Sequence, residues 1–189
     1  GAVGETFAVT ANNLFVPARG GLGESVELQA NTIASTMAKK TGGQYRLLHV
    51  PDPLSEDAYQ SLIQVPDIRE IVESIRQARI VVHGIGDAMV MARRRKVDDT
   101  TIRLLEERGA CAEAFGYYFD RQGTVVHKMP TVGLRLEDIE RVETVIAVAG
   151  GASKAQAIAS VLRAGHEDVL VIDEGAALEL LKEMEERFA

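Results

Sequence analysis

The sequence has almost no cysteine and no long apolar run. Its 189 residues include a single cysteine, Cys111, so no disulfide can form within the chain, as is usual in a reducing cytoplasm. No apolar run approaches the roughly 18 residues of a membrane span. The first residues also lack the basic stretch and apolar segment of a secretory signal. We therefore expect a cytoplasmic protein without a membrane partner.

An excess of positive charge is also missing. The chain has 28 acidic and 21 basic residues, for a net charge of -7, which argues against the whole domain gripping nucleic acid. Its four histidines, His49, His83, His127 and His166, do not have the spacing of metal ligands. No nucleophile stands beside an obvious base. We expect no metal, no cofactor and no catalytic residue.

The most informative stretch present is Val145 to Arg163. The apolar run Val145–Ala149 is rich in valine and isoleucine, which favours a buried parallel strand, and Gly150 and Gly151 allow a tight turn after it. A helix then begins with Ser153 and Lys154 in its first turn. The free N–H groups at such a helix start bind anions, phosphate above all. The alternative is an ordinary turn in which Ser153 caps the helix.

Strands and helices alternate along nearly the whole chain. This pattern predicts an α/β fold, a mostly parallel sheet flanked by helices, in one domain over residues 1–189. The expected strands are 7–10, 14–17, 45–50, 80–86 with its turn, 114–119, 124–128, 145–149 and 168–172, with 114–119 and 124–128 forming an antiparallel hairpin. The expected helices are about 25–39, 55–64, from 66, from 87, from 98 or 99 to 108, 136–142, 153–163 and from 175 to about 187.

Glycine-bearing loops follow several of these strands. Ligands bind beyond the carboxyl ends of parallel strands, so we expect four loops on one rim: Arg19-Gly20-Gly21, Gly84-Ile85-Gly86, Gly150–Lys154 and Asp173-Glu174-Gly175. None fits a nucleotide fingerprint. Met89 stands where a dinucleotide loop would have its third glycine, and Gly150–Lys154 lacks the Walker A spacing.

Individual charged residues leave alternatives open. Arg19 could fork onto a phosphate or be a solvated loop arginine. Arg93 to Lys96 could be a nucleic-acid patch, a phosphate clamp or a solvated helix end, and at most two of the four can face the rim. Glu113, before an aromatic stretch, could accept sugar hydroxyls or form a surface salt bridge.

Taken together and in order, five stretches resemble the SorC family of bacterial transcriptional repressors. They are Pro17–Gly23, Gln29–Thr32, Val82–Gly86, Glu113–Phe119 and Ala147–Lys154. The resemblance covers essentially the whole chain from Leu14. It implies an effector-binding domain with a fold similar to glucosamine-6-phosphate deaminase, ribose-5-phosphate isomerase and the coenzyme A transferases. It also implies that the domain senses a phosphorylated sugar. In the subfamily that represses glycolytic genes, the effector is fructose 1,6-bisphosphate or a related hexose phosphate, which weakens operator binding.

The resemblance also implies roles for individual residues. Arg19, Arg94 and Lys154 would hold phosphates, and Gln29 and Glu113 would hold sugar hydroxyls. With the glycine loops, the predicted ligand-binding set becomes Arg19, Gly20, Gly21, Gln29, Gly84, Arg94, Glu113, Gly151, Ser153 and Lys154.

The chain departs from the family pattern in two places. We expect it to be N-terminally truncated and to lack the helix-turn-helix domain, so that operator DNA is bound only through that missing part. The family's threonine-rich phosphate loop is also absent after the first strand, because Thr10 is followed directly by Ala11-Asn12-Asn13.

Three functions remain open at this stage. The leading one is the effector-binding domain of a repressor, which also forms homo-oligomers, either dimers or tetramers. The second is a sugar-phosphate isomerase or deaminase of the same fold, for which only Glu113 and Asp173-Glu174 could supply a general base. The third is a structural dimerisation domain that binds no ligand.

Overall fold

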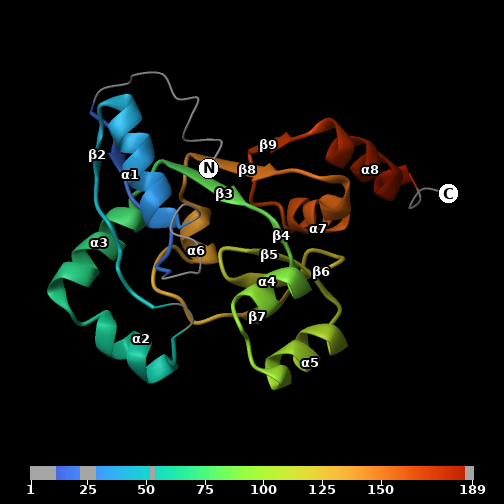
Figure 1. The fold of residues 1–189 in the computed structure, drawn as a ribbon, viewed down its shortest axis with the longest axis horizontal. Coiled ribbons are helices and arrows are strands. Elements are labelled where there is room, and N and C mark those ends of the chain that lie inside the picture. Colours follow the sequence, from blue (N-terminus) through green and yellow to red (C-terminus); the bar gives the residue numbers. More distant parts are fainter. Residues whose placement is uncertain (1–11, 22–28, 52–53, 186–189) are drawn as a thin grey trace. The chain divides into compact units, whose positions relative to one another are not determined.

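The computed structural model describes residues 12–21, 29–51 and 54–185 (Figure 1). The chain divides into two compact units, Gly1–Ala78 with Pro130–Asp138, and Arg79–Met129 with Ile139–Ala189. The strand expected at 7–10 and the first residues of the helix expected at 25–39 lie outside the described residues. Within the described ranges, no helix is both long enough and apolar enough to cross a membrane.

The first unit is built on a short parallel pair of strands. β1 (Leu14–Phe15) pairs with β2 (Gln44–Tyr45), and α1 (Ala30–Thr41) connects them. Gly42 ends α1 in the left-handed conformation, with φ 73°, as the Gly-Gly pair predicts. α1 continues two residues past the expected end at Lys39.

The strand expected over residues 45–50 is wrong beyond Tyr45. Its apolar residues are present, and Leu48 and Val50 are buried. The Leu48 backbone is not bonded to a neighbouring strand, however. Its N–H donates to Asn31 Oδ1 at 2.9 Å, and its carbonyl accepts from Asn31 Nδ2 at 3.0 Å. A buried side-chain amide thus provides the hydrogen bonds that a strand would provide, which propensity alone does not predict.

Two helices complete the first unit, and both begin where the sequence predicts. α2 (Glu56–Leu62) starts after Ser55, whose Oγ accepts the Ala58 N–H, and α3 (Pro66–Arg76) has Pro66 in its first turn. α3 buries Val72 and Ile75. α6 (Leu136–Ile139) begins where the sequence predicts a short helix or turn over 136–142, and it ends three residues earlier than expected.

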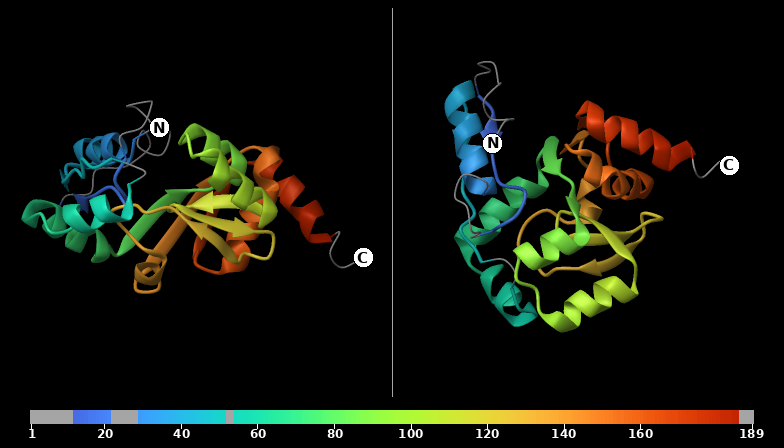
Figure 2. Two further views of the ribbon diagram at one scale, coloured as in Figure 1. Left: turned by 90° about the horizontal axis from the view of Figure 1, so that it is seen from below. Right: turned by 45° about the vertical axis from the view of Figure 1, so that its right-hand side comes forward.

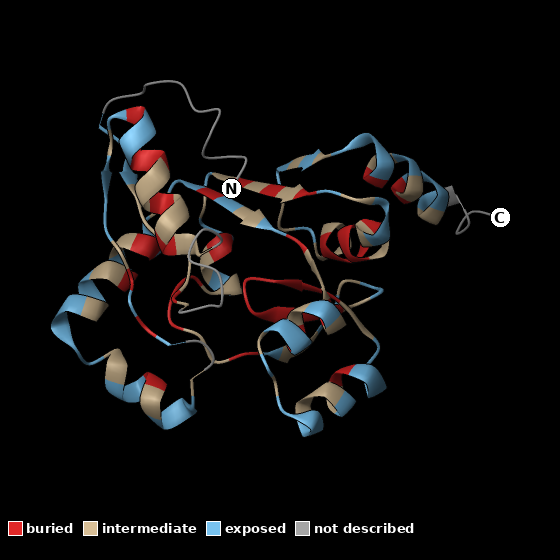
Figure 3. Cartoon of the chain, viewed as in Figure 1, coloured by how far each residue is buried: buried red, intermediate tan, exposed pale blue. Residues whose placement is uncertain are grey.

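The second unit contains the main parallel sheet. β3 (Ile80–Gly84), β8 (Thr144–Ala149) and β9 (Val169–Ile172) are all parallel, in the order β3-β8-β9. Between β8 and β9 run the 3-10 turn η3 (Ala152–Lys154) and α7 (Ala155–Ala164), which ends at Gly165 as predicted. α8 (Glu174–Glu185) follows β9 and packs against α7. α7 is largely buried (Figure 3).

An antiparallel sheet forms the rest of the second unit. It contains β4 (Gly86–Asp87), β5 (Ala110–Ala114), β6 (Tyr117–Asp120) and β7 (Val125–Lys128), in the order β4-β5-β6-β7. α4 (Ala88–Arg94) and α5 (Asp99–Glu107) pack on β5 and on each other (Figure 2). Their shared core is Ala88, Ala92, Leu105, Tyr118 and Met129.

The single strand expected over 114–119 is wrong. The chain reverses at Phe115 and Gly116, which have φ of 56° and 86°, so that β5 and β6 form a hairpin of their own. The sequence does not predict this turn, because phenylalanine rarely takes the positive φ that Phe115 has here. The hairpin expected around Asp120–Gly123 is confirmed as β6–β7, with Asp120 Oδ1 accepting from the N–H groups of Gln122 and Thr124.

The β6–β7 turn is fastened to α7. Ser160 Oγ donates to the Asp120 carbonyl at 2.6 Å, and Arg163 Nη1 donates to the Arg121 carbonyl at 2.7 Å. A Cβ on Gly123 would lie 2.6 Å from Ala164 N, so the turn touches the helix backbone directly. The α/β class with parallel strands flanked by helices is confirmed, and the strands are distributed over three sheets.

Candidate functional site

Three of the four expected glycine loops meet at one rim. Gly84, Gly150–Lys154 and Asp173–Gly175 follow the carboxyl ends of β3, β8 and β9, which are adjacent parallel strands of one sheet. The fourth loop, Arg19-Gly20-Gly21, follows β1 in the separate sheet of the first unit. The three loops at the rim of the β3-β8-β9 sheet are therefore the part of the predicted site that belongs to the second unit.

The loop after β8 differs from the expected helix start. Gly151 has a φ of 95°, which favours glycine, and residues 152–154 form a 3-10 turn before α7. No side-chain hydrogen bond caps either element, so the alternative role of Ser153 as a helix cap is wrong. Ser153 is exposed at the rim.

Lys154 joins two of the loops. Its Nζ donates to the Ile85 carbonyl at 3.1 Å, across 69 residues of sequence. Lys154 is half-buried, so the ammonium is held at the rim between the loops after β3 and β8. This places a fixed positive charge where an anionic ligand would meet the sheet.

Asp173 is the residue at the rim whose role sequence analysis did not predict. Its Oδ2 accepts the Gly151 N–H and its Oδ1 accepts the Ala176 N–H, both at 2.7 Å. A Cβ on Gly150 would lie 2.8 Å from Asp173 Oδ2. The carboxylate thus occupies space that the absence of a Cβ at Gly150 leaves open, and a Cβ there would displace it.

Glu113 is buried, so the alternative that it forms a surface salt bridge is wrong. Its Oε1 accepts from Arg95 Nη2 at 2.9 Å and from the Gly116 N–H at 2.7 Å. The Glu113 side chain is 5% exposed and that of Arg95 is 13% exposed. The carboxylate thus fixes the β5–β6 turn and the end of α4 together.

The arginine beside Glu113 is Arg95, whereas the resemblance selected Arg94. Arg94 is exposed as the last residue of α4, and Arg95 follows it at the helix end. The two side chains point in different directions because successive helical residues are about 100° apart. The two arginines differ in burial, and a run of four basic residues gives no sequence signal for which of them is buried.

A buried pair of ionisable side chains lies beside Gly84. His83 Nε2 is 3.5 Å from Glu167 Oε1, and the two side chains are 5% and 3% exposed. The His83 ring lies against Phe115, with the ring centroids 4.1 Å apart. His83 therefore packs against the β5–β6 turn, the same turn that Glu113 fixes.

In the first unit, the Arg19 loop is held by the segment Val132–Leu134. Arg19 forms an isolated antiparallel bridge with Gly133, and the Gly20 N–H donates to the Val132 carbonyl at 2.8 Å. A Cβ on Gly20 would meet the Val50 side chain at 2.0 Å. Gln29 immediately precedes α1, and its carbonyl accepts the Ile33 N–H at 3.0 Å. Arg19, Gly20, Gly21 and Gln29 thus belong to one unit, and the other six predicted residues belong to the second.

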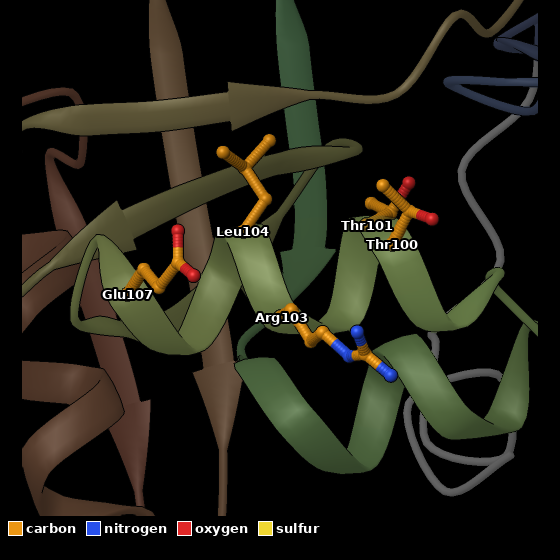
Figure 4. Close-up of a pocket in the computed structure, with 5 residues that line it drawn as sticks. All are labelled: Thr100, Thr101, Arg103, Leu104 and Glu107. Carbon is orange, nitrogen blue, oxygen red and sulfur yellow. The ribbon is translucent and has the colours of Figure 1, made fainter.

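In the part of the chain that the structure describes, neither a metal centre nor a depression on α5 coincides with the predicted residues. In the described ranges, no group of three or more His, Cys, Asp and Glu side chains could hold a metal ion. Five residues of α5 line an open depression of about 290 Å³ (Figure 4): Thr100, Thr101, Arg103, Leu104 and Glu107. None of the predicted site residues is among them.

Comparison with known proteins identifies the family of the chain. Residues 3–182 match the model of a family described as "Putative sugar-binding domain". The chain is 54% identical to the "Central glycolytic genes regulator" of Priestia megaterium, over 90% of this chain and 50% of that protein. It is 49% identical to the regulator of the same name from Bacillus subtilis, over 96% of this chain and 54% of that protein. The chain spans about half the length of these curated relatives.

A solved structure agrees with the sequence matches. The crystal structure of a "putative SorC family transcriptional regulator" from Enterococcus faecalis is 48% identical, with a TM-score of 0.83, over 90% of this chain and 69% of that one. The family resemblance predicted from the five sequence stretches is thereby confirmed. The chain belongs to the family of sugar-binding domains that SorC-type transcriptional regulators carry.

Proposed function

We propose that this chain is the effector-binding and oligomerising domain of a repressor of glycolytic genes. Its effector would be a phosphorylated sugar, with fructose 1,6-bisphosphate as the leading candidate and related hexose phosphates as alternatives. The similarity to two regulators of central glycolytic genes supports the regulatory role. The observation that carries the ligand class is Lys154, held beside the glycine loop at the sheet rim, because a fixed cation next to a glycine turn suits a phosphate.

In this proposal the effector acts by shifting populations. A ligand that binds one arrangement of subunits better than another stabilises that arrangement, and the affinity of the whole protein for its operator changes accordingly. The longer regulator would contact DNA through residues outside this chain, would be a dimer or tetramer, and would act in the cytoplasm. The residues proposed to bind the sugar phosphate are Arg94, Glu113 and Lys154 in the second unit and Arg19 and Gln29 in the first.

An isomerase or deaminase is the second candidate, but the described contacts do not favour it. A general base needs a carboxylate that can reach the sugar carbon. Glu113 accepts hydrogen bonds from Arg95 and Gly116, and Asp173 accepts them from Gly151 and Ala176. In the free chain both carboxylates accept hydrogen bonds from other groups of the protein, so we propose no catalytic role for them.

Thermal melting against a panel of phosphosugars tests the proposal. An effector at about 100 times its Kd should add roughly 2.7 kcal/mol of stability, which corresponds to about 5–11 °C for a chain of this size. The shift should occur with fructose 1,6-bisphosphate and should shrink in Lys154→Met. Lys182→Met is the matched control, because Lys182 lies on the exposed face of α8 and pairs with Glu179.

Two further measurements separate the alternatives. Turnover of glucosamine 6-phosphate or ribose 5-phosphate by the chain would favour the enzyme over the effector domain. A complete absence of stabilisation by any phosphosugar would favour the structural dimerisation domain. Operator binding by the full-length regulator that does not respond to any sugar phosphate would refute the proposal.

A further inference from the structure

The loop expected to receive phosphate already holds an anion, the carboxylate of Asp173. The Gly151 N–H points at Asp173 Oδ2, at a distance of 2.7 Å. This N–H belongs to the glycine turn before η3 and α7, where the positive ends of the peptide dipoles gather. The carboxylate therefore occupies one of the positions at which the oxygen of a bound phosphate would be stabilised.

The local sequence is shaped around this internal contact. Gly150 leaves the space that Asp173 Oδ2 fills, since a Cβ there would be only 2.8 Å from the oxygen. The contact is solvent-exposed, and Asp173 itself is exposed, so the carboxylate can turn away without opening the core. Its other oxygen accepts the Ala176 N–H at the start of α8. One carboxylate thus connects the end of β8 to the beginning of α8.

We propose that Asp173 is an internal competitor of the effector's phosphate, occupying the Gly151 amide in the free protein and leaving it when phosphate binds. This inference rests on the proposed function, because it takes the loop with Lys154 as the place where a phosphate is received. The Asp173 carboxylate and a phosphate cannot both accept the same Gly151 N–H, and two negative charges placed side by side repel each other. The apparent affinity is therefore reduced by the fraction of molecules in which Asp173 blocks the amide.

Internal competition has two consequences for regulation. It raises the effector concentration at which the domain responds, so that the protein senses an abundant metabolite and ignores traces of it. A second consequence is that phosphate binding breaks the hydrogen bond from Gly151 to Asp173, which connects the glycine turn to α8. Ala177 N–H still donates to the Asp173 carbonyl at 3.0 Å, so α8 keeps its start while the link to β8 is broken.

The test uses Asp173→Asn, with Asp168→Asn as the matched control. Asparagine is as good a helix cap as aspartate but has no charge. Asp168 precedes the amino end of β9 and also accepts a backbone N–H, from Val145 at 2.8 Å. The control therefore makes the same change of charge at the opposite end of the same strand. Isothermal titration measures the Kd of fructose 1,6-bisphosphate, inorganic phosphate and fructose for each chain.

We expect Asp173→Asn to bind fructose 1,6-bisphosphate and inorganic phosphate roughly tenfold more tightly than the native chain. Asp168→Asn should bind both as the native chain does, and uncharged fructose should show no gain in either variant. If the native chain binds but Asp173→Asn binds no more tightly, the competitor is refuted and the effector site stands. If neither chain binds any phosphate compound, the effector site falls and the competitor falls with it.

A second variant protects the test against misfolding. Asp173→Ser retains a capping oxygen for Ala176 but has only one oxygen, which cannot serve Ala176 and Gly151 together. It should therefore show the same gain in affinity as Asp173→Asn. A gain in the asparagine variant that is absent in a folded serine variant would contradict competition for the Gly151 amide.

Discussion

The contact between Arg95 and Glu113 offers a direct test of how the second unit is held together. Arg95 Nη2 and Glu113 Oε1 are 2.9 Å apart, and both side chains are mostly removed from water. Removing one member of such a buried pair typically costs 3–5 kcal/mol, because the remaining charge is left in a poor environment. Glu113 still accepts the Gly116 N–H at 2.7 Å in the variant, so we expect a cost at the low end of this range. We predict that Arg95→Met lowers the free energy of unfolding by about 3 kcal/mol.

Urea unfolding followed by circular dichroism measures this loss. A cost of about 3 kcal/mol should also lower Tm by roughly 6–12 °C in a chain of this length. Arg93→Met is the matched control, because Arg93 is an exposed arginine near the same helix end. A surface change of that kind should stay within about 0.5 kcal/mol.

A double variant separates the charge from the packing. Glu113→Gln can still accept the Gly116 N–H but carries no charge, so adding it to Arg95→Met should recover part of the lost stability. The coupling between the two positions should be about 1–3 kcal/mol. If Arg95→Met unfolds at the same urea concentration as Arg93→Met, the pair does not stabilise the unit and the reasoning is refuted.

Three further predictions concern other parts of the chain. Asn31→Ala should cost about 2–3 kcal/mol in urea unfolding, because it leaves both backbone groups of Leu48 without their buried partner; a loss under 0.5 kcal/mol would contradict this. Gly123→Ala should destabilise the chain more than Gly109→Ala in the same assay: both have positive φ, but only at Gly123 does a Cβ meet backbone atoms closer than 3 Å. Burial raises the pKa of the Cys111 thiol, so alkylation by iodoacetamide at pH 7 should be slower than that of free cysteine. Its rate should rise as the pH passes the raised pKa, and rapid alkylation at neutral pH would contradict the burial.

Helix boundaries were the part of the fold most accessible from the sequence. Asp87 and Asp98 each accept an N–H in the first turn of the helix that follows, and Gly42 and Gly165 end theirs in the left-handed conformation. These features depend on a few neighbouring residues, so local chemistry determines them. The alternation of strands and helices followed from the same local pattern, and so did the meeting of three of the four glycine loops at one rim.

The features that could not be predicted depend on residues distant in sequence. Leu48 is bonded to an amide 17 residues earlier in the chain and not to a strand. In the turn at Phe115 and Gly116, Glu113 accepts the Gly116 N–H and the His83 ring lies against Phe115. Arg95 differs from its basic neighbours by its burial against Glu113, and the sequence alone does not show that burial. The contact of Asp173 with Gly151 likewise becomes visible only when β8 and β9 are side by side.

α7 is secured at both of its ends, and this gives it a mechanical role. Its amino end follows the rim loop that contains Lys154, and its last turns bond to the β6–β7 turn through Ser160 and Arg163. Ten helical residues span about 15 Å. The helix cannot rotate or slide without breaking the hydrogen bonds that Ser160 and Arg163 make with the β6–β7 turn. A small displacement at the rim is therefore transmitted along α7 to the β6–β7 turn.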